Sequence, residues 1–177
     1  MAKRRPTGIL SGDGVTLDIS DAVNELHIKS CFGAKISEKK LKLSLLEAAY
    51  LLSKEKIIVK DSKKKRLDAS VFIRMAQRHE KKFFSRFSVF RNMRDRGYVV
   101  KTALKFGGDF RVYDRGVRPG EDHARWILYP VNETDELTWY DFAAKNRVAH
   151  STKKRLMIGV TDEEGDVTYY EIRWMRP

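Results

Sequence analysis

One tyrosine, one histidine and one lysine stand in short segments that are rich in glycine and positive charge. The segments are residues 107–113, 121–123 and 147–154, and the three residues are Tyr113, His123 and Lys154. A phenol, an imidazole and an ammonium group can act as base, acid and cationic stabiliser when a phosphodiester is cleaved. The three segments therefore indicate phosphodiester chemistry without a metal ion.

The three residue types differ in how readily they take these parts. An unperturbed imidazole, with a pKa of about 6.5, both binds and releases a proton near neutrality, which makes His123 the simplest assignment. A lysine is charged at pH 7 and suits electrostatic stabilisation. A phenol is mostly protonated there, so Tyr113 would need nearby cations such as Lys154 or Arg111 to act as a base, or would mainly position the nucleophile. Taken alone, a tyrosine at a strand end is most often a packing residue, so the joint pattern carries the prediction.

The same segments, together with three further stretches, resemble one protein family. The further stretches are residues 43–51, 94–102 and 165–170, so the resemblance covers nearly the whole chain. In their order and separations they resemble the archaeal tRNA-splicing endonuclease of the homotetrameric short-subunit type. Matched position by position, the family's motifs imply Tyr113, His123 and Lys154 as the catalytic residues.

The resemblance implies that RNA is cleaved by its own 2′-hydroxyl, with no metal ion and no cofactor. Tyr113 would lie on the nucleophile side as candidate base, and His123 would protonate the 5′-oxygen leaving group. Lys154 would stabilise the charge of the pentavalent phosphorane. The expected products are a 2′,3′-cyclic phosphate and a 5′-hydroxyl.

The implied substrate is precursor tRNA with a bulge-helix-bulge, two bulges separated by a short helix. Arg147 would pack against an extruded bulge base, and Arg173 would supply the opposite face, although Arg176 competes for that assignment. Recognition should rest on RNA shape, because A-form helices offer little readable sequence. His150 is expected to be a structural hydrogen-bonding residue, not a second acid.

The composition agrees with a polyanionic partner. Lysine and arginine number 36 against 24 aspartate and glutamate, which gives a net charge of +12. The single Cys31 cannot form an internal disulfide, excludes a zinc site of cysteine type and fits a reducing compartment. No apolar run follows the basic first six residues or approaches the roughly 18 residues of a membrane helix, so a soluble cytoplasmic protein that contacts no membrane is expected.

The pattern along the chain predicts the elements that position these residues. A hairpin is expected over residues 7–19, a capping box opens a helix at Ser44, a strand follows at 57–59, and residues 70–96 form two helices or one kinked helix. Strands at 98–100, 109–113, 126–131, 156–161 and 167–174, with one helix at 139–146, complete the pattern. The predicted fold is α/β (α+β): a small N-terminal α/β domain (1–82) and a C-terminal nuclease domain (83–177) with a central mixed sheet flanked by helices, residues 83–96 forming a linking helix.

Two segments are candidates for self-assembly into the homotetramer, a dimer of dimers, that the resemblance implies. The acidic stretch 132–136, with Asp135 and Glu136, matches a loop that the family inserts into a basic cleft of another dimer. Alternatively, this stretch is an ordinary polar loop. The C-terminal strand 167–174 is expected to pair with its own copy across a dyad, which would hide an apolar edge.

Two other functions fit parts of the sequence. Asp109 followed by residues 121–123 loosely resembles the acidic site of a metal-dependent restriction-type nuclease, although the lysine of such sites is missing. A non-catalytic RNA-binding subunit of a splicing complex would need no catalytic groups. The presence of Tyr113, His123 and Lys154 together argues against that second alternative.

Overall fold

The computed structural model describes residues 5–103 and 107–175. The chain divides into two compact units, Met1–Phe83 and Phe84–Pro177, and each has a mixed sheet with helices. The predicted α/β class is thereby confirmed. Over the described ranges, no helix combines the length and the apolar character needed to cross a membrane.

The first unit contains a six-stranded sheet in the order β3-β4-β2-β1-β5-β6. The strands are β1 (Thr7–Ser11), β2 (Gly14–Asp18), β3 (Ala34–Ser37), β4 (Lys40–Ser44), β5 (Ile58–Lys60) and β6 (Arg66–Leu67). β1 and β2 form the predicted hairpin, in which Gly12 adopts a φ of 57° that favours glycine. Because β1 pairs in parallel with β5 and antiparallel with β2, the sheet is mixed.

The helices of this unit are α1 (Asp21–Asn24), the π-helix η1 (Glu25–Lys29), α2 (Leu45–Ser53) and α3 (Ala69–His79). α2 starts with the predicted capping box: the Glu47 backbone N–H donates to Ser44 Oγ at 3.2 Å, and the Ser44 N–H donates to the Glu47 carboxylate at 3.0 Å. Alternate side chains of β2 and β4 are fully buried in the core, namely Val15, Leu17, Leu41 and Leu43.

The helical pattern over residues 70–96 forms two helices, α3 and α4 (Phe83–Asp95). They are separate because Glu80, which follows α3, adopts an extended conformation with φ −134° and ψ 111°. The sequence had left open one long kinked helix, and the extended backbone at Glu80 decides between the two.

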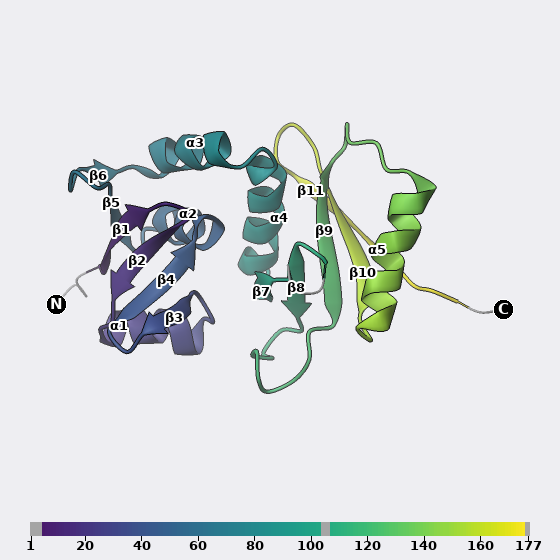
Figure 1. The fold of residues 1–177 in the computed structure, drawn as a ribbon, viewed down its shortest axis with the longest axis horizontal. Helices are drawn as coiled ribbons and strands as arrows, with labels where there is room; N and C mark the ends of the chain where they lie inside the picture. Colours follow the sequence, from purple (N-terminus) through teal and green to yellow (C-terminus); the bar gives the residue numbers. More distant parts are fainter. Residues whose placement is uncertain (1–4, 104–106, 176–177) are drawn as a thin grey trace. The chain divides into compact units, whose positions relative to one another are not determined.

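The second unit contains a five-stranded sheet in the order β11-β10-β9-β8-β7. The strands are β7 (Val99–Thr102), β8 (Phe110–Tyr113), β9 (Trp126–Asn132), β10 (Arg155–Thr161) and β11 (Val167–Ile172). All neighbours are antiparallel except β9 and β10, whose parallel pairing is connected through α5 (Trp139–Ser151). α4 and α5 cover opposite faces of this sheet (Figure 1).

α5 is longer than the predicted helix, which ended at residue 146. Residues 147–151 contain no helix breaker, and the helix stops only where the Thr152 hydroxyl bonds back to the Val148 carbonyl at 2.9 Å and Lys153 takes a φ of 55°. Arg147 and His150 therefore lie on the C-terminal part of a helix, and not in a loop. The last strand is shorter than predicted, because β11 ends at Ile172.

Candidate active site

Three separate segments of the second unit line one pocket of about 340 Å³. β8 contributes Arg111 and Tyr113, the loop between β8 and β9 contributes residues 120–124, and the turn after α5 contributes Lys154. The fold thus brings Tyr113, His123 and Lys154 to the same pocket, although 41 positions separate Tyr113 from Lys154 in the sequence. A pocket with an imidazole, a phenol and an ammonium group has the groups that general acid–base cleavage of a phosphodiester needs.

β8 positions Tyr113 through the alternation of side chains along a strand. Phe110 faces α4, where its ring packs 6.1 Å from that of Phe90, so Arg111 and Tyr113 lie together on the other face. Gly108 allows this strand to approach β9, because a Cβ at that position would lie 2.5 Å from Ile127 Cγ2. Tyr113 is 4% exposed, which fixes its ring while it still lines the pocket.

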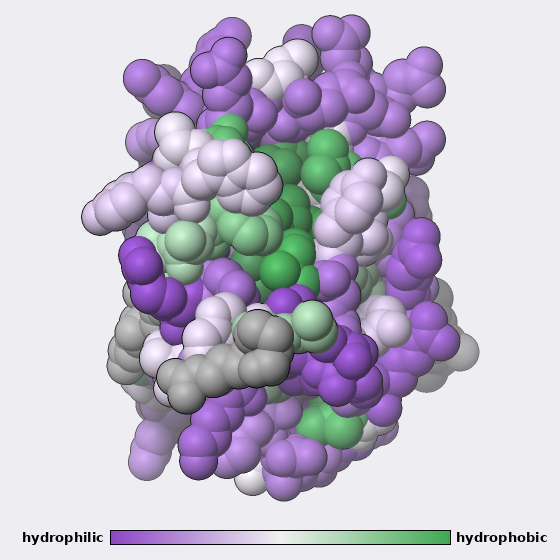
Figure 2. Space-filling view, turned by 90° about the vertical axis from the view of Figure 1, so that its right-hand side faces the viewer, coloured by the Kyte–Doolittle hydropathy of each residue, from purple (hydrophilic) through white to green (hydrophobic). Residues whose placement is uncertain are grey.

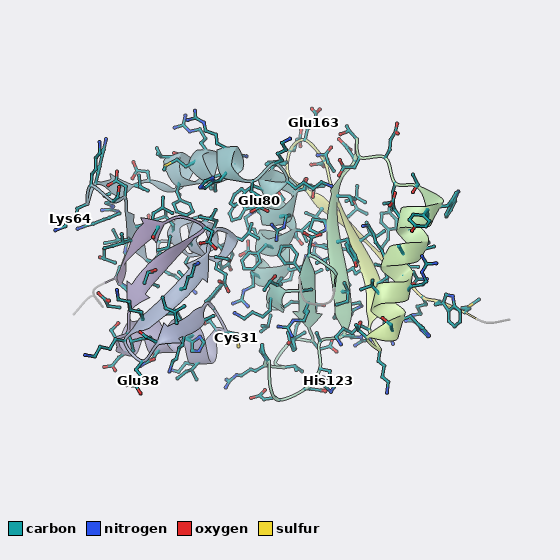
Figure 3. The ribbon with its side chains drawn as sticks, viewed as in Figure 1. Cys31, Glu38, Lys64, Glu80, His123 and Glu163 are labelled. Atoms are coloured by element: carbon teal, nitrogen blue, oxygen red, sulfur yellow. The ribbon has the colours of Figure 1, made fainter. Side chains whose placement is uncertain are left out.

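His123 lies on the exposed loop between β8 and β9 (Figure 3). Its backbone N–H donates to Asp122 Oδ1 at 2.6 Å. The base of the loop is closed by an ion pair of 3.1 Å between Arg125 and Asp114, and by the Arg125 N–H, which donates to the Val112 carbonyl at 2.9 Å. The imidazole is therefore carried on a closed loop with access to solvent.

Lys154 is placed by the C-terminal end of α5. Its backbone N–H donates to the Ala149 carbonyl at 2.8 Å, and its Nζ donates to the Thr152 carbonyl at 2.9 Å. Partial burial lowers the pKa of the Lys154 ammonium, and the positive charge of Arg111 lowers it further. Arg111 and Lys154 thus line the same pocket as two groups of like charge.

The two arginines predicted to bind RNA are outside the pocket lining. Arg147 is exposed on α5, and Arg173 is exposed after β11, where its Nε donates to Glu171 Oε1 at 2.8 Å. Their segments meet where the His150 ring packs 4.6 Å from the Trp174 ring. His150 thus has a packing role here, and Arg176, the competing candidate, lies outside the described residues.

A carboxylate that the sequence analysis missed connects three strands of the sheet that carries this site. Glu171 on β11 accepts a 2.7 Å hydrogen bond from Trp126 Nε1 on β9 and pairs with Arg155 on β10 at 3.2 Å, in addition to Arg173. The bond from Trp126, with those from the arginines, lowers the pKa of Glu171 to about 2 against the cost of its partial burial. No sequence motif marks it, because its partners are brought together only by the sheet.

The acidic residues of the alternative metal site are placed differently. Asp109 pairs with Arg86 Nε at 3.1 Å and does not line the pocket, whereas Glu121 lines it and pairs with Arg118. Burial, followed by the charge of Asp109, raises the pKa of Tyr129. Among the residues that the structure describes, no three histidine, cysteine, aspartate or glutamate side chains gather as metal ligands.

Comparison with known proteins matches both parts of the chain. Residues 83–169 match the family model of the tRNA intron endonuclease catalytic C-terminal domain, and residues 7–73 match that of the N-terminal domain. The chain is 42% identical to the tRNA-splicing endonuclease of Thermococcus kodakarensis over 167 residues, which cover 94% of this chain and 96% of the relative. The tRNA-splicing endonuclease of Methanothermobacter thermautotrophicus is 38% identical over 174 residues, 98% of this chain and 99% of the relative.

Proposed function

The chain belongs to the tRNA intron endonuclease family, and from this premise we propose how it cuts precursor tRNA. The enzyme is a tRNA intron endonuclease, and its substrate is precursor tRNA folded into a bulge-helix-bulge. Catalysis belongs to residues 83–177, and residues 1–82 form a separate domain. The observation that carries the proposal is the pocket at which Tyr113, His123 and Lys154 meet.

The reaction is an internal transfer of the phosphate. The 2′-oxygen of the nucleotide before the cut bonds to phosphorus, and its proton leaves on the side of Tyr113. The bond between phosphorus and the 5′-oxygen breaks, and His123 gives that oxygen a proton. Lys154 stabilises the additional charge on the non-bridging oxygens of the phosphorane. The products are a 2′,3′-cyclic phosphate and a 5′-hydroxyl.

The RNA contacts of the proposal lie on the C-terminal segments beside the pocket. Arg147 and Arg173 stack on an extruded bulge base, since a guanidinium plane stacks on any base without reading sequence. Support comes from the packing of His150 on Trp174, which brings the two segments together, and from Glu171, which orients the Arg173 guanidinium. The enzyme acts in the cytoplasm on introns of varied sequence.

A homotetramer, as a dimer of dimers, completes the proposal, because a bulge-helix-bulge presents two cuts to two active subunits. β11 is an edge strand of its sheet, with its outer edge open to a second copy. An apolar area is exposed on the side of this unit that carries α5 (Figure 2). Partly buried Val131, Val160 and Ile172 and the 56% exposed Tyr170 belong to that face of the sheet.

The test uses purified protein and two RNAs that differ only in the 2′-hydroxyl groups at the two cuts. A bulge-helix-bulge RNA incubated with excess EDTA should be cut, and analysis of the fragment ends should find 2′,3′-cyclic phosphate and 5′-hydroxyl. The same RNA with a 2′-deoxy substitution at each of the two cuts should bind and stay intact. Cleavage of the deoxy RNA, or loss of cleavage in EDTA, would falsify this mechanism and favour a metal-activated water as the nucleophile.

A further inference from the structure

Arg111 is a cation of the pocket to which the mechanism above gives no part. It lies two residues before Tyr113 on β8, so both side chains lie on the same face of the sheet and both line the pocket. Its Nε donates to the Thr102 carbonyl of β7 at 3.1 Å. A guanidinium has five N–H donors in a planar fork, so one arginine can serve several acceptors at once.

Arg111 and Lys154 border one pocket with charges of the same sign. Two like charges at close range repel, and the lowered pKa of Lys154 reflects this repulsion after the larger effect of burial. An anion between them removes the repulsion. The scissile phosphate is such an anion, and its charge on the non-bridging oxygens increases as the phosphorane forms, so a pair of cations favours the transition state over the ground state.

We propose that Arg111 is a fourth catalytic residue, whose guanidinium binds a non-bridging oxygen of the scissile phosphate beside Lys154 and stabilises the phosphorane. This inference rests on the proposed function. A guanidinium suits the role because it is planar, stays protonated at every working pH and donates to phosphate oxygens through parallel N–H groups. Arg111 therefore supplies the fixed charge of the pair, and Lys154 supplies the charge that can titrate.

A purely structural role is the alternative, since the bond to Thr102 joins β8 to β7. Two substitutions separate the roles. Arg111→Gln keeps an N–H donor for the Thr102 carbonyl and removes the charge, whereas Arg111→Lys keeps the charge and loses the guanidinium plane. Arg96→Gln is the matched control, because Arg96 is an exposed arginine of the same unit that donates to Asn92 Oδ1 and lies over the Tyr169 ring, away from the pocket lining.

The decisive measurement is the single-turnover cleavage rate of a bulge-helix-bulge RNA at saturating full-length protein. Arg111→Gln should lower the rate by about 10²- to 10³-fold, the usual effect of losing one preorganised donor to a developing oxyanion. Arg111→Lys should fall between Arg111→Gln and wild type, and Arg96→Gln should cut at the wild-type rate. A folded Arg111→Gln protein with the wild-type rate would overturn the proposal, and so would Arg111→Lys that cuts no faster than Arg111→Gln.

The dependence of the cleavage rate on pH also separates the two roles, because a purely structural role of Arg111 would leave this dependence unchanged. Lys154 faces Arg111 and Tyr113 from β8, and Glu121, Asp122 and His123 from the loop. Removing the Arg111 charge removes one cause of the lowered Lys154 pKa, so the alkaline decline of the rate should move to higher pH in Arg111→Gln. An unmoved decline contradicts the proposal.

One further measurement uses the wild-type protein and does not depend on a variant with reduced activity. If Arg111→Gln does not fold, the arginine Nε–H resonances of the wild-type protein are followed by NMR while the uncleavable 2′-deoxy RNA is added. The resonance that is missing in Arg111→Lys belongs to Arg111 and should shift on binding; an unshifted resonance overturns the inference. Absence of cleavage by the wild-type protein would instead count against the proposed function itself, which keeps the two failures distinct.

Discussion

A general acid and a charge stabiliser act on one phosphate only if their side chains reach it from fixed backbones. His123 comes from a loop closed at its base by Arg125 and Asp114, and Lys154 comes from a turn fixed by the end of α5. Tyr113 is held by burial in the sheet. Each of the three residues thus has its own support, so each can be replaced singly with a separable effect.

Replacing the proposed acid should stop chemistry and spare binding. His123→Ala should lower the single-turnover rate by about two to four orders of magnitude, the usual contribution of a general acid. Affinity for the 2′-deoxy RNA should stay near the wild-type value, because His123 acts on the leaving group. His79→Ala is the control, since His79 is an exposed residue at the end of α3 in the first unit, and it should retain the wild-type rate. A His123→Ala rate near wild type would remove the acid assignment.

Lys154 should set the alkaline limit of activity. Its pKa is lowered by burial and then by Arg111, so it loses its charge at a lower pH than an ordinary lysine, and the rate should decline as pH rises through that pKa. Lys154→Arg keeps a permanent charge and should remove this decline, and Lys154→Ala should lower the rate by about 10²- to 10³-fold at every pH. The measurement is the cleavage rate of each protein from pH 6 upwards. If Lys154→Arg shows the same alkaline decline as wild type, the decline belongs to a group other than Lys154.

At the scale of elements, local signals were readable from the sequence and sheet partners were not. The hairpin of β1 and β2 and the capping box at Ser44 depend on residues within four positions of one another, and the structure confirms both. β3 and β4 pair with each other and were still not predicted, because residues 38–39 between them include no glycine, proline, asparagine or aspartate to mark a turn. The other partner of β4 is β2, which lies elsewhere in the sequence. The length of α5 was underestimated because its end depends on Thr152 and Lys153, which lie beyond the predicted helix and carry no signal of a helix end in the sequence.

The same distinction applies to the site. Tyr113, His123 and Lys154 were predicted from the family's motifs, and the sheet brings them to one pocket. Glu171 was missed because its bonds to Trp126 and Arg155 join residues 45 and 16 positions away. Arg111 was predicted only as a cation near Tyr113, although its spacing of two from Tyr113 within a strand already places both side chains on one face of the sheet.

Glu171 provides a stability prediction that belongs to the sheet. Its carboxylate joins β9, β10 and the segment after β11, and its folded pKa of about 2 lies below the ordinary 4.5. A lowered folded pKa means stability that is present above the unfolded pKa and is lost as pH falls towards 2. Glu171→Gln should therefore lower the free energy of unfolding by about 1 kcal/mol at pH 7, a small loss because the side chain is partly exposed. As the pH falls towards the folded pKa of Glu171, the substitution should change this free energy hardly at all.

Chemical denaturation of Glu171→Gln and wild type at pH 7 and at successively lower pH measures this difference. Glu163→Gln is the control, because Glu163 lies in an exposed turn. A difference that stays constant as the pH falls would show that the substitution acts through packing and not through the charged network.

At the scale of the whole molecule, the surface of the catalytic unit argues for assembly. An open edge at β11 and an exposed apolar area on the side of α5 are costly on an isolated subunit. The loop that follows β9, residues 132–136, is polar and not apolar. Within this loop the Asp135 carboxylate accepts a hydrogen bond from the Asn132 N–H at 3.1 Å, which stabilises the turn. An apolar face suits a permanent contact within a dimer, whereas an exposed acidic loop suits a contact between dimers that have a net positive charge.

If the acidic loop joins dimers and the apolar face forms each dimer, substitutions in the loop should dissociate the proposed tetramer without dissociating its dimers. Asp135→Asn with Glu136→Gln should convert tetramers to dimers as the protein is diluted or salt is added, because the acidic loop loses its attraction for a basic cleft. The subunit should stay folded, since both side chains are exposed and the asparagine retains an oxygen that can accept from Asn132. Glu163→Gln with Glu164→Gln removes the same charge from another exposed turn and should leave the tetramer intact. Light scattering over a range of concentration and salt measures the mass, and a double variant that keeps the wild-type tetramer mass throughout would make residues 132–136 an ordinary solvent-exposed loop.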